Sequence, residues 1–165
     1  GAGVEGFFGD DGRTTIYDYW GVPEHQRWMG NGNFTGDSLS GEQRQLHQSY
    51  TDLLNLAANN PALTRGDYFD LTEYNIGAGN FDEKVCAYIR YEGEERLLIL
   101  ASFNAVSKNI KVQIPKEVIT KLSLDTAGVY IARDLLWREA EVGFNKDFLF
   151  ELTCKPYSSY IFKIK

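Results

Sequence analysis

The first 39 residues gather the side chains that could take part in chemistry, namely carboxylates and aromatic rings. Asp10 and Asp11 lie between two glycines and are followed by Arg13. A two-carboxylate glycosidase needs side chains that face each other across a sugar, roughly 5 Å or more apart, whereas neighbours in one loop point apart. We therefore interpret the acidic pair as a turn in which Arg13 pairs with one carboxylate, in preference to direct contact with a ligand.

Other catalytic or metal-binding patterns are weak. His25 and His47 form no His-x-x-x-His spacing, and the chain has no Cys-x-x-Cys, so no zinc site is expected. Ser158 and Ser159 precede the last predicted strand without the Gly-x-Ser-x-Gly elbow that exposes a nucleophile. The sequence therefore assigns no catalytic residue, no metal ligand and no cofactor.

The aromatic residues of the same segment suggest a ligand of a different kind. Tyr17, Tyr19, Trp20 and Trp28 lie in a polar, glycine-rich stretch. Flat rings stack on sugar faces while their polar tips bond hydroxyl groups, which suits an uncharged polar ligand. The alternative is that these rings anchor a long loop to a folded body, and for any single ring we favour that interpretation.

Composition narrows the classes of partner. The formal net charge is −6 and the isoelectric point is near 4.9, without a basic run, which disfavours nucleic acid and anionic membranes. No window has the roughly 18 apolar residues of a membrane span, and we expect no signal peptide within the chain. The start Gly-Ala-Gly, without Met, reads as processed or truncated.

Residues 40–60 form the one well-marked helix of the sequence. Ser40 and Gln43 have the spacing of a capping box, and Asn60 before Pro61 ends the helical pattern. Its apolar residues repeat along one stripe of the helix, which must pack against another apolar surface. The stripe consists of Leu46, Tyr50, Leu53, Leu54 and Ala57.

The chain after the helix has the pattern of an all-β domain. Short stretches of period-two alternation and turn signals predict about eight strands, the first of them at 68–74 and the last at 159–164. The segment 116–124 fits either a helical turn or an irregular crossing. We predict a mainly β fold, an antiparallel Greek-key-like sandwich preceded by one helix and a long N-terminal loop.

The two cysteines lie within apolar strand patterns. We interpret Cys86 and Cys154 as two buried free thiols, with a disulfide as the less favoured alternative, because two cysteines form no disulfide framework.

Several stretches resemble bacterial members of the alpha-amylase family of glycoside hydrolases. The run Asp11-Gly12-Arg13-Thr14-Thr15-Ile16-Tyr17-Asp18-Tyr19-Trp20, followed by Pro23-Glu24-His25, is similar to the segment after the eighth barrel strand. Asn60-Pro61-Ala62-Leu63, leading to Arg65-Gly66-Asp67-Tyr68, resembles the crossing from the last barrel helix into the C-terminal domain. Phe103-Asn104 and Pro156-Tyr157-Ser158 resemble stretches of the C-terminal sandwich.

The resemblance implies a fragment. Residues 1–66 would be a barrel remnant, with an active-face loop at 1–39 and the last helix at 40–60, and residues 67–165 would be the C-terminal β-sandwich. The family's catalytic Asp, Glu and Asp would precede Gly1, so the chain alone should be inactive. Arg13, Tyr17, Tyr19, Trp20 and Trp28 become candidate substrate contacts in the parent enzyme, since barrel active sites lie on such loops.

The partners implied are an α-glucan and the barrel of the same chain, with calcium as an option in the parent. Bond specificity and location, whether periplasmic, extracellular or cytoplasmic, stay open. The alternative from another class is a stand-alone carbohydrate-binding sandwich, and a third is an interaction domain without a ligand. Without a barrel, the helix stripe should be buried by self-association or against the chain's own sandwich.

Overall fold

The computed structural model describes residues 23–125, 127–138, 140–144 and 147–165. The chain divides into two compact units, residues 1–51 and residues 52–165, and each is considered by itself. Among the described residues, no helix combines the length and apolar character that a membrane crossing requires.

The first unit contains helical structure that the sequence analysis did not predict. Helix α1 spans Pro23–Met29 and a 3-10 turn, η2, spans Gly30–Gly32. Proline is favoured at the first helical position. Glu24 in the first turn and Arg27 in the last turn interact favourably with the helix dipole and stabilise the helix. The expectation of a wholly irregular segment was therefore wrong over these residues, because seven residues are too few to display a helical period.

Helix α2 spans Gly41–Asn59 and begins as predicted. The Ser40 amide donates to Gln43 Oε1 at 2.9 Å and the Gln43 amide donates to Ser40 Oγ at 3.2 Å, which is the reciprocal capping box. Asn60 leaves the helical region, with φ −114° and ψ 113°, and a second short helix, α3, follows at Pro61–Thr64. The predicted helix and its stop are confirmed.

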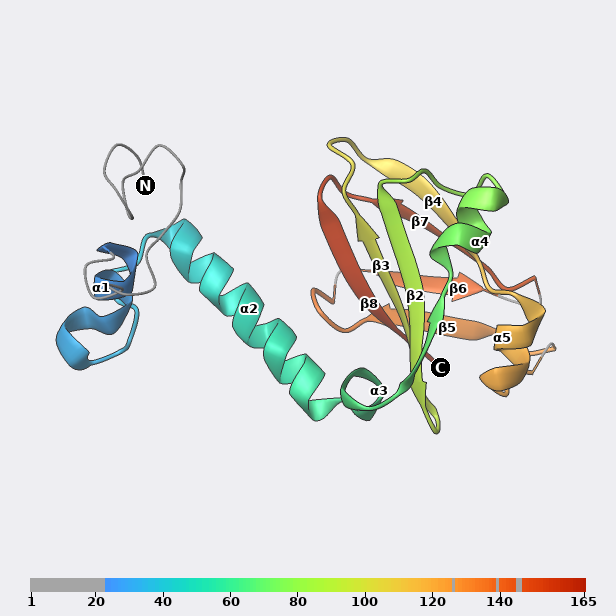
Figure 1. The fold of residues 1–165 in the computed structure, drawn as a ribbon, viewed down its shortest axis with the longest axis horizontal. Coiled ribbons are helices and arrows are strands. Elements are labelled where there is room, and N and C mark those ends of the chain that lie inside the picture. The colour runs from blue at the N-terminus through green and yellow to red at the C-terminus, as the bar shows by residue number, and fades with distance from the viewer. Residues whose placement is uncertain (1–22, 126, 139, 145–146) are drawn as a thin grey trace. The chain divides into compact units, whose positions relative to one another are not determined.

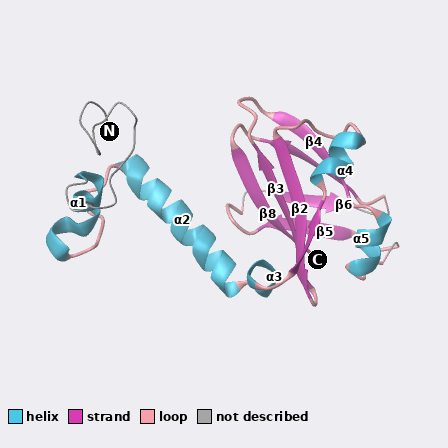
Figure 2. Ribbon diagram, viewed as in Figure 1, coloured by secondary structure: helices cyan, strands magenta, loops and turns pink. Residues whose placement is uncertain are grey.

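The second unit contains an open antiparallel sandwich, which confirms the predicted fold class (Figures 1 and 2). The strands among the described residues are β1 (Asp67–Asp70), β2 (Val85–Glu92), β3 (Glu95–Ser102), β4 (Lys108–Gln113), β5 (Tyr130–Asp134), β6 (Glu141–Phe144), β7 (Leu149–Cys154) and β8 (Ser158–Ile164). A six-stranded sheet has the order β1-β2-β3-β8-β5-β6, and β4 pairs with β7 in a second sheet.

The main core lies between the two sheets. Alternate residues of β2, such as Val85, Ala87 and Ile89, point into it, and Phe150 of β7 packs edge-on against Phe162 of β8 with ring centroids 4.8 Å apart. Aromatic pairs of this geometry add roughly 0.5–1.5 kcal/mol beyond their buried area. Six aromatic residues are buried in this core, namely Phe81, Phe144, Phe148, Phe150, Tyr160 and Phe162.

One strand boundary differs from the sequence interpretation, and one segment that the sequence left undecided proves to be a helix. The predicted strand at 68–74 ends at Asp70, because the Asp70 carboxylate accepts the Thr72 amide at 2.7 Å and the chain turns into helix α4, Thr72–Gly77. Side-chain bonds of this kind compete with the strand ladder. The undecided segment after Pro115 is helix α5, Lys116–Lys121.

Both cysteines are free thiols. Cys154 is part of the core between the sheets, whereas Cys86 alternates with Val85 and Ala87 and therefore lies on the opposite face of the large sheet. The disulfide alternative is thereby excluded.

Candidate functional site

Trp28 is the one predicted substrate contact that the structure describes. The other four, Arg13, Tyr17, Tyr19 and Trp20, lie outside the described residues, as do Asp10 and Asp11. The half-buried Trp28 ring lies edge-on to Phe34, with centroids 5.3 Å apart, and close to both histidines, at 6.0 Å from His25 and 6.3 Å from His47. These contacts also suit a packing role, so the assignment of Trp28 to substrate binding stays a prediction.

A shallow groove of about 470 Å³ runs beside Trp28 in the first unit. Its lining is largely apolar and consists of Glu24, His25, Trp28, Leu39, Gln43, Leu46, His47 and Tyr50. The two histidines share no motif in the sequence, whereas in the structure their ring centroids lie 6.0 and 6.3 Å from that of Trp28. The described residues contain no group of acidic, histidine and cysteine side chains that could hold a metal ion.

The apolar stripe of α2 lacks cover. Leu46, Tyr50 and Leu54 are 61%, 60% and 64% exposed, and no residue of α2 is buried. Fully burying one such side chain is worth roughly 1.5–3 kcal/mol. Contiguous apolar surface of this kind marks an interaction face.

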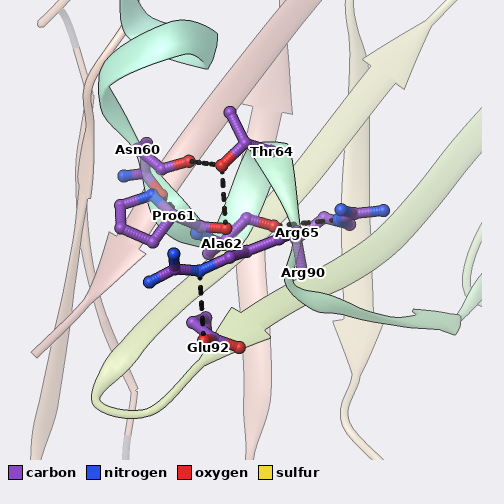
Figure 3. Close-up of polar contacts among 7 residues, drawn as sticks. All are labelled: Asn60, Pro61, Ala62, Thr64, Arg65, Arg90 and Glu92. Atoms are coloured by element: carbon purple, nitrogen blue, oxygen red, sulfur yellow. Dashed lines mark hydrogen bonds and ion pairs between the residues drawn. The ribbon is translucent and has the colours of Figure 1, made fainter.

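The junction between the helices and the sandwich is built from specific polar contacts (Figure 3). Asn60 caps α3, because its Oδ1 accepts the Ala62 amide at 3.0 Å, and Pro61 occupies the first helical turn. The Thr64 hydroxyl donates at 3.3 Å to the carbonyls of Asn60 and Pro61. The short helix is thus closed on itself before it meets the sheet.

Arg90 of β2 fastens α3 to the sheet (Figure 3). Its Nε donates to the Ala62 carbonyl at 3.0 Å and its NH2 donates to the Leu63 carbonyl at 3.1 Å. Both carbonyls belong to the last turn of the helix, where a cation also complements the helix dipole. Glu92, at the end of the same strand, forms an exposed ion pair with Arg65, whose Nε lies 3.3 Å from Glu92 Oε1.

Gly66 allows the backbones to approach. A Cβ at this position would lie 2.5 Å from the Ala62 carbonyl oxygen and 2.7 Å from that of Tyr91. Only glycine fits such an approach without a shift of the backbone. The sequence contains two signals for this junction, a lone arginine within an alternating apolar strand and a glycine after the helix stop, but neither signal by itself predicts docking.

The outer face of the large sheet carries a second apolar cluster. Ala62 of α3 packs there with Leu97, Ile99 and Ile161, while Leu56 of α2 lies against the same cluster. Further along this face, Tyr68 and Tyr88 lie with ring centroids 5.4 Å apart, and Tyr68 is more than half exposed. The face is therefore apolar and aromatic beyond the area that α3 covers.

The titratable groups of the sandwich point to structure rather than catalysis. Burial raises the pKa of the Cys154 thiol to about 11, so it is protonated and unreactive at neutral pH. A hydrogen bond from Asn104 lowers the pKa of Asp82, which also pairs with Lys108 at 3.6 Å. Asp134 is buried, but the amides of Leu136, Trp137 and Ile161 satisfy its carboxylate.

These observations define a class of protein: a β-sandwich domain that carries a docked helical connection and an uncovered apolar helix face. No protein-family model matches the chain, and no curated protein matches it. Solved structures of alpha-amylase family enzymes do match its fold.

Three structures give the extent of this likeness. AmyP E221Q in complex with maltotriose matches with a TM-score of 0.58 and 19% identity over 77% of this chain and 22% of that one. AmyP in complex with maltose matches with a TM-score of 0.56 and 19% identity, over 76% of this chain and 21% of that one. An alpha-amylase from Anoxybacillus matches with a TM-score of 0.53 and 18% identity, over 73% of this chain and 22% of that one.

The chain therefore spans about a fifth of the length of these enzymes. The likeness confirms, at the level of fold, the resemblance drawn from the sequence motifs. At these identities it shows the fold alone.

Proposed function

We propose that the chain is the C-terminal part of a bacterial α-amylase-like glycoside hydrolase that acts on α-glucans. In this proposal the chain is not catalytic by itself, and its sandwich packs against the catalytic barrel and stabilises it. The fold likeness, which covers most of this chain but about a fifth of each amylase, supports the proposal.

The observation that carries the proposal is the combination of a fastened junction and uncovered apolar surface. Arg90 and Gly66 hold α3 against the sheet, so the helical connection and the sandwich form a continuous structure at this point. The exposed stripe of α2 and the aromatic outer face need a large apolar partner. A barrel encoded in the same chain is a partner of this kind.

The coding sequence that precedes Gly1 provides the decisive test. We expect it to encode a (β/α)8 barrel with catalytic Asp, Glu and Asp at the ends of its fourth, fifth and seventh strands. An upstream sequence without such a barrel would overturn the proposal.

An activity assay tests the non-catalytic role separately. The 165-residue chain is assayed on soluble starch and on a chromogenic maltoside, and we expect no turnover above a buffer control. Turnover that survives purification would contradict the proposal. Saturable maltoheptaose binding that is lost in Trp20→Ala or Trp28→Ala would favour the alternative, a stand-alone carbohydrate-binding module.

A further inference from the structure

Strands β6 and β7 lie at one side of the sandwich, where the two strands contact each other (Figure 1). β6 stands at the end of the six-stranded order, and β7 forms the two-stranded sheet with β4. A strand at the edge of a sheet carries a row of backbone N–H and C=O groups that its single neighbour leaves unused. The hydrogen bonds that are present decide which residues carry these groups.

Glu141 and Gly143 carry the unused groups of β6. The Asp134 amide of β5 donates to the Ala140 carbonyl at 3.0 Å. Bonded and non-bonded pairs alternate along an antiparallel ladder, so Glu141 and then Gly143 fall in non-bonded positions and direct their backbone groups to the free edge. Ile131, which lies opposite Gly143, agrees with this assignment, because it exchanges two hydrogen bonds of 3.0 Å with the residue after β8.

Leu149, Glu151 and Thr153 carry the unused groups of β7. The Ile114 amide donates to the Phe148 carbonyl at 3.0 Å, and this pair continues the register of β4 and β7. The three residues therefore fall in non-bonded positions, with their backbone groups directed away from β4. Within the part of the chain that the structure describes, no hydrogen bond reaches these backbone groups.

The free edge of β4 shows how the same chain closes an edge elsewhere. Gln113 lies opposite Leu149, so its backbone groups point away from β7. The buried Asn75 side chain bonds to both of them, since its Oδ1 accepts the Gln113 amide at 2.7 Å and its Nδ2 donates to the Gln113 carbonyl at 3.1 Å. Among the described residues, no side chain does the same for the free edges of β6 and β7.

A groove of about 320 Å³ lies at these open edges. Its lining consists of Val142, Gly143, Phe144, Asp147, Leu149 and Glu151. Three of these residues, Gly143, Leu149 and Glu151, also carry unused backbone groups. Gly143 has no side chain to keep a second backbone away, and glycine within a strand often marks such an approach. The groove is therefore suited to an extended chain.

Both charged side chains of the lining, Asp147 and Glu151, are acidic. Glu151 pairs with Lys111 at 3.1 Å, but the pair is exposed, and exposed pairs contribute little, so a basic side chain of a partner can share the carboxylate. A second copy of the chain would bring the same acidic edge and a net charge of −6, and like charges across a strand pair are unfavourable. The charges favour a basic partner.

We propose that the free edge of β7 binds an extended, basic peptide segment of a partner protein by strand addition. Backbone groups of the segment would bond to Leu149, Glu151 and Thr153, and its Lys or Arg side chains would pair with the two acidic residues of the groove. Strand addition of this kind takes its affinity from main-chain hydrogen bonds and its specificity from alternate side chains. The proposal does not depend on the proposed function, because it rests on the ladder and the groove alone.

Titration of the 165-residue chain with the synthetic peptide acetyl-Lys-Val-Thr-Val-Lys-Val-amide tests the proposal. We expect saturable binding by calorimetry. By NMR, hydrogen exchange at the amides of Glu151 and Thr153 should slow about tenfold when the free peptide is at about ten times its Kd. The Phe150 amide, which already faces β4, should change less. Binding that slows neither edge amide would overturn the proposal.

Two control peptides separate backbone pairing from charge. The same peptide N-methylated at every residue keeps its charge but has no N–H donor, and the peptide with Glu in place of Lys keeps the donors but reverses the charge. Both should bind at least about tenfold more weakly, since each lacks one of the two interactions. Equal binding of the N-methylated peptide would exclude strand addition.

Matched variants locate the edge. Glu151→Pro removes an N–H that the ladder with β4 does not use, and proline is tolerated at such positions, so binding should fall at least about tenfold while the chain stays folded. Glu151→Gln keeps the N–H and should weaken binding only several-fold. Asn109→Pro makes the same backbone change on the free edge of β4 and should leave affinity unchanged.

Two further outcomes would overturn the proposal. The first is loss of binding in Asn109→Pro and not in Glu151→Pro, which would place the peptide on β4. The second is slowed exchange of the Glu151 and Thr153 amides as the concentration of the chain alone rises, which would identify a second copy as the occupant. The exchange measurement on the unsubstituted chain decides the matter even where a proline variant fails to fold.

Discussion

Arg90 illustrates how much one side chain decides in this molecule. It belongs to a strand whose alternate residues form the core, yet it points to the outer face and bonds two carbonyls of α3. Two further residues act at the same junction: Gly66 allows close backbone contact, and Asn60 caps the start of α3. The residues that matter most for the connection are therefore polar or small.

Arg90→Met should destabilise the second unit by roughly 1.5–3 kcal/mol, because it removes hydrogen bonds from a charged donor and leaves two carbonyls unpaired. Urea unfolding measures this change. Arg133→Met is the matched control, since Arg133 and Glu141 form an exposed pair at 2.6 Å, worth at most about 1 kcal/mol. Equal effects of the two substitutions would contradict the role of Arg90.

Cys154 makes stability sensitive to alkali. Its pKa is about 11 in the folded chain and near 9 otherwise, so its contribution is complete below pH 9 and is lost as the pH rises toward 11. We expect the free energy of unfolding to decline between pH 9 and 10 less steeply in Cys154→Ala than in the wild type. Identical slopes in Cys154→Ala and the wild type would refute the prediction.

At the scale of elements, the decisive feature is which face each element presents. The α2 helix has a capped start and a defined stop but no buried residue, whereas the shorter α3 and α5 contribute to the two apolar clusters. The α2 helix was the easiest element to predict because of its length and its apolar pattern. The α3 helix matters more for the fold because it packs against the sheet.

Gly66→Ala should separate α3 from β2, because the added methyl group meets two backbone oxygens closer than 3 Å. We expect a loss of about 1–3 kcal/mol in the free energy of unfolding, the usual cost of overpacking. Gly77→Ala at the end of α4, where a Cβ meets nothing within 4 Å, provides the control and should be nearly neutral. Thermal unfolding of both variants would show whether the close approach is required.

At the scale of the whole molecule, an uncovered apolar helix face sets the behaviour in solution. Leu46, Tyr50 and Leu54 of the stripe are each more than half exposed, and no residue of α2 is buried. Burial of the stripe by self-association, or against the chain's own sandwich, stays a prediction for the isolated chain.

The triple variant Leu46→Gln, Tyr50→Gln and Leu54→Gln should shift the chain from a self-associated form toward a monomer without loss of folded stability, because these side chains are more than half exposed. Static light scattering and thermal melting measure the two effects. Substitution of the exposed Val129, Ile131 and Tyr157 by Gln serves as a control with a similar loss of apolar surface elsewhere. A wild-type chain that is monomeric would contradict this prediction.

Much of the fold could be predicted from the sequence because its signals are local. The capping box at Ser40 and Gln43 is confirmed by its two hydrogen bonds, and period-two alternation found the strands of the sandwich. The site was far less predictable. Trp28 was singled out for its chemistry, but its neighbour His47 comes from α2, so no local pattern joins the two.

The sequence by itself determined where the long helix begins and ends and that a β-sandwich follows, since caps, proline and alternation act within a few residues. Only the tertiary structure decided that Arg90 holds α3, that Cys86 and Cys154 lie on opposite faces of a sheet, and that the strand predicted to reach Tyr74 stops at Asp70. These outcomes depend on contacts between segments far apart in sequence, or on one side-chain hydrogen bond that replaces the hydrogen bonds between strands. A local sequence pattern predicts neither.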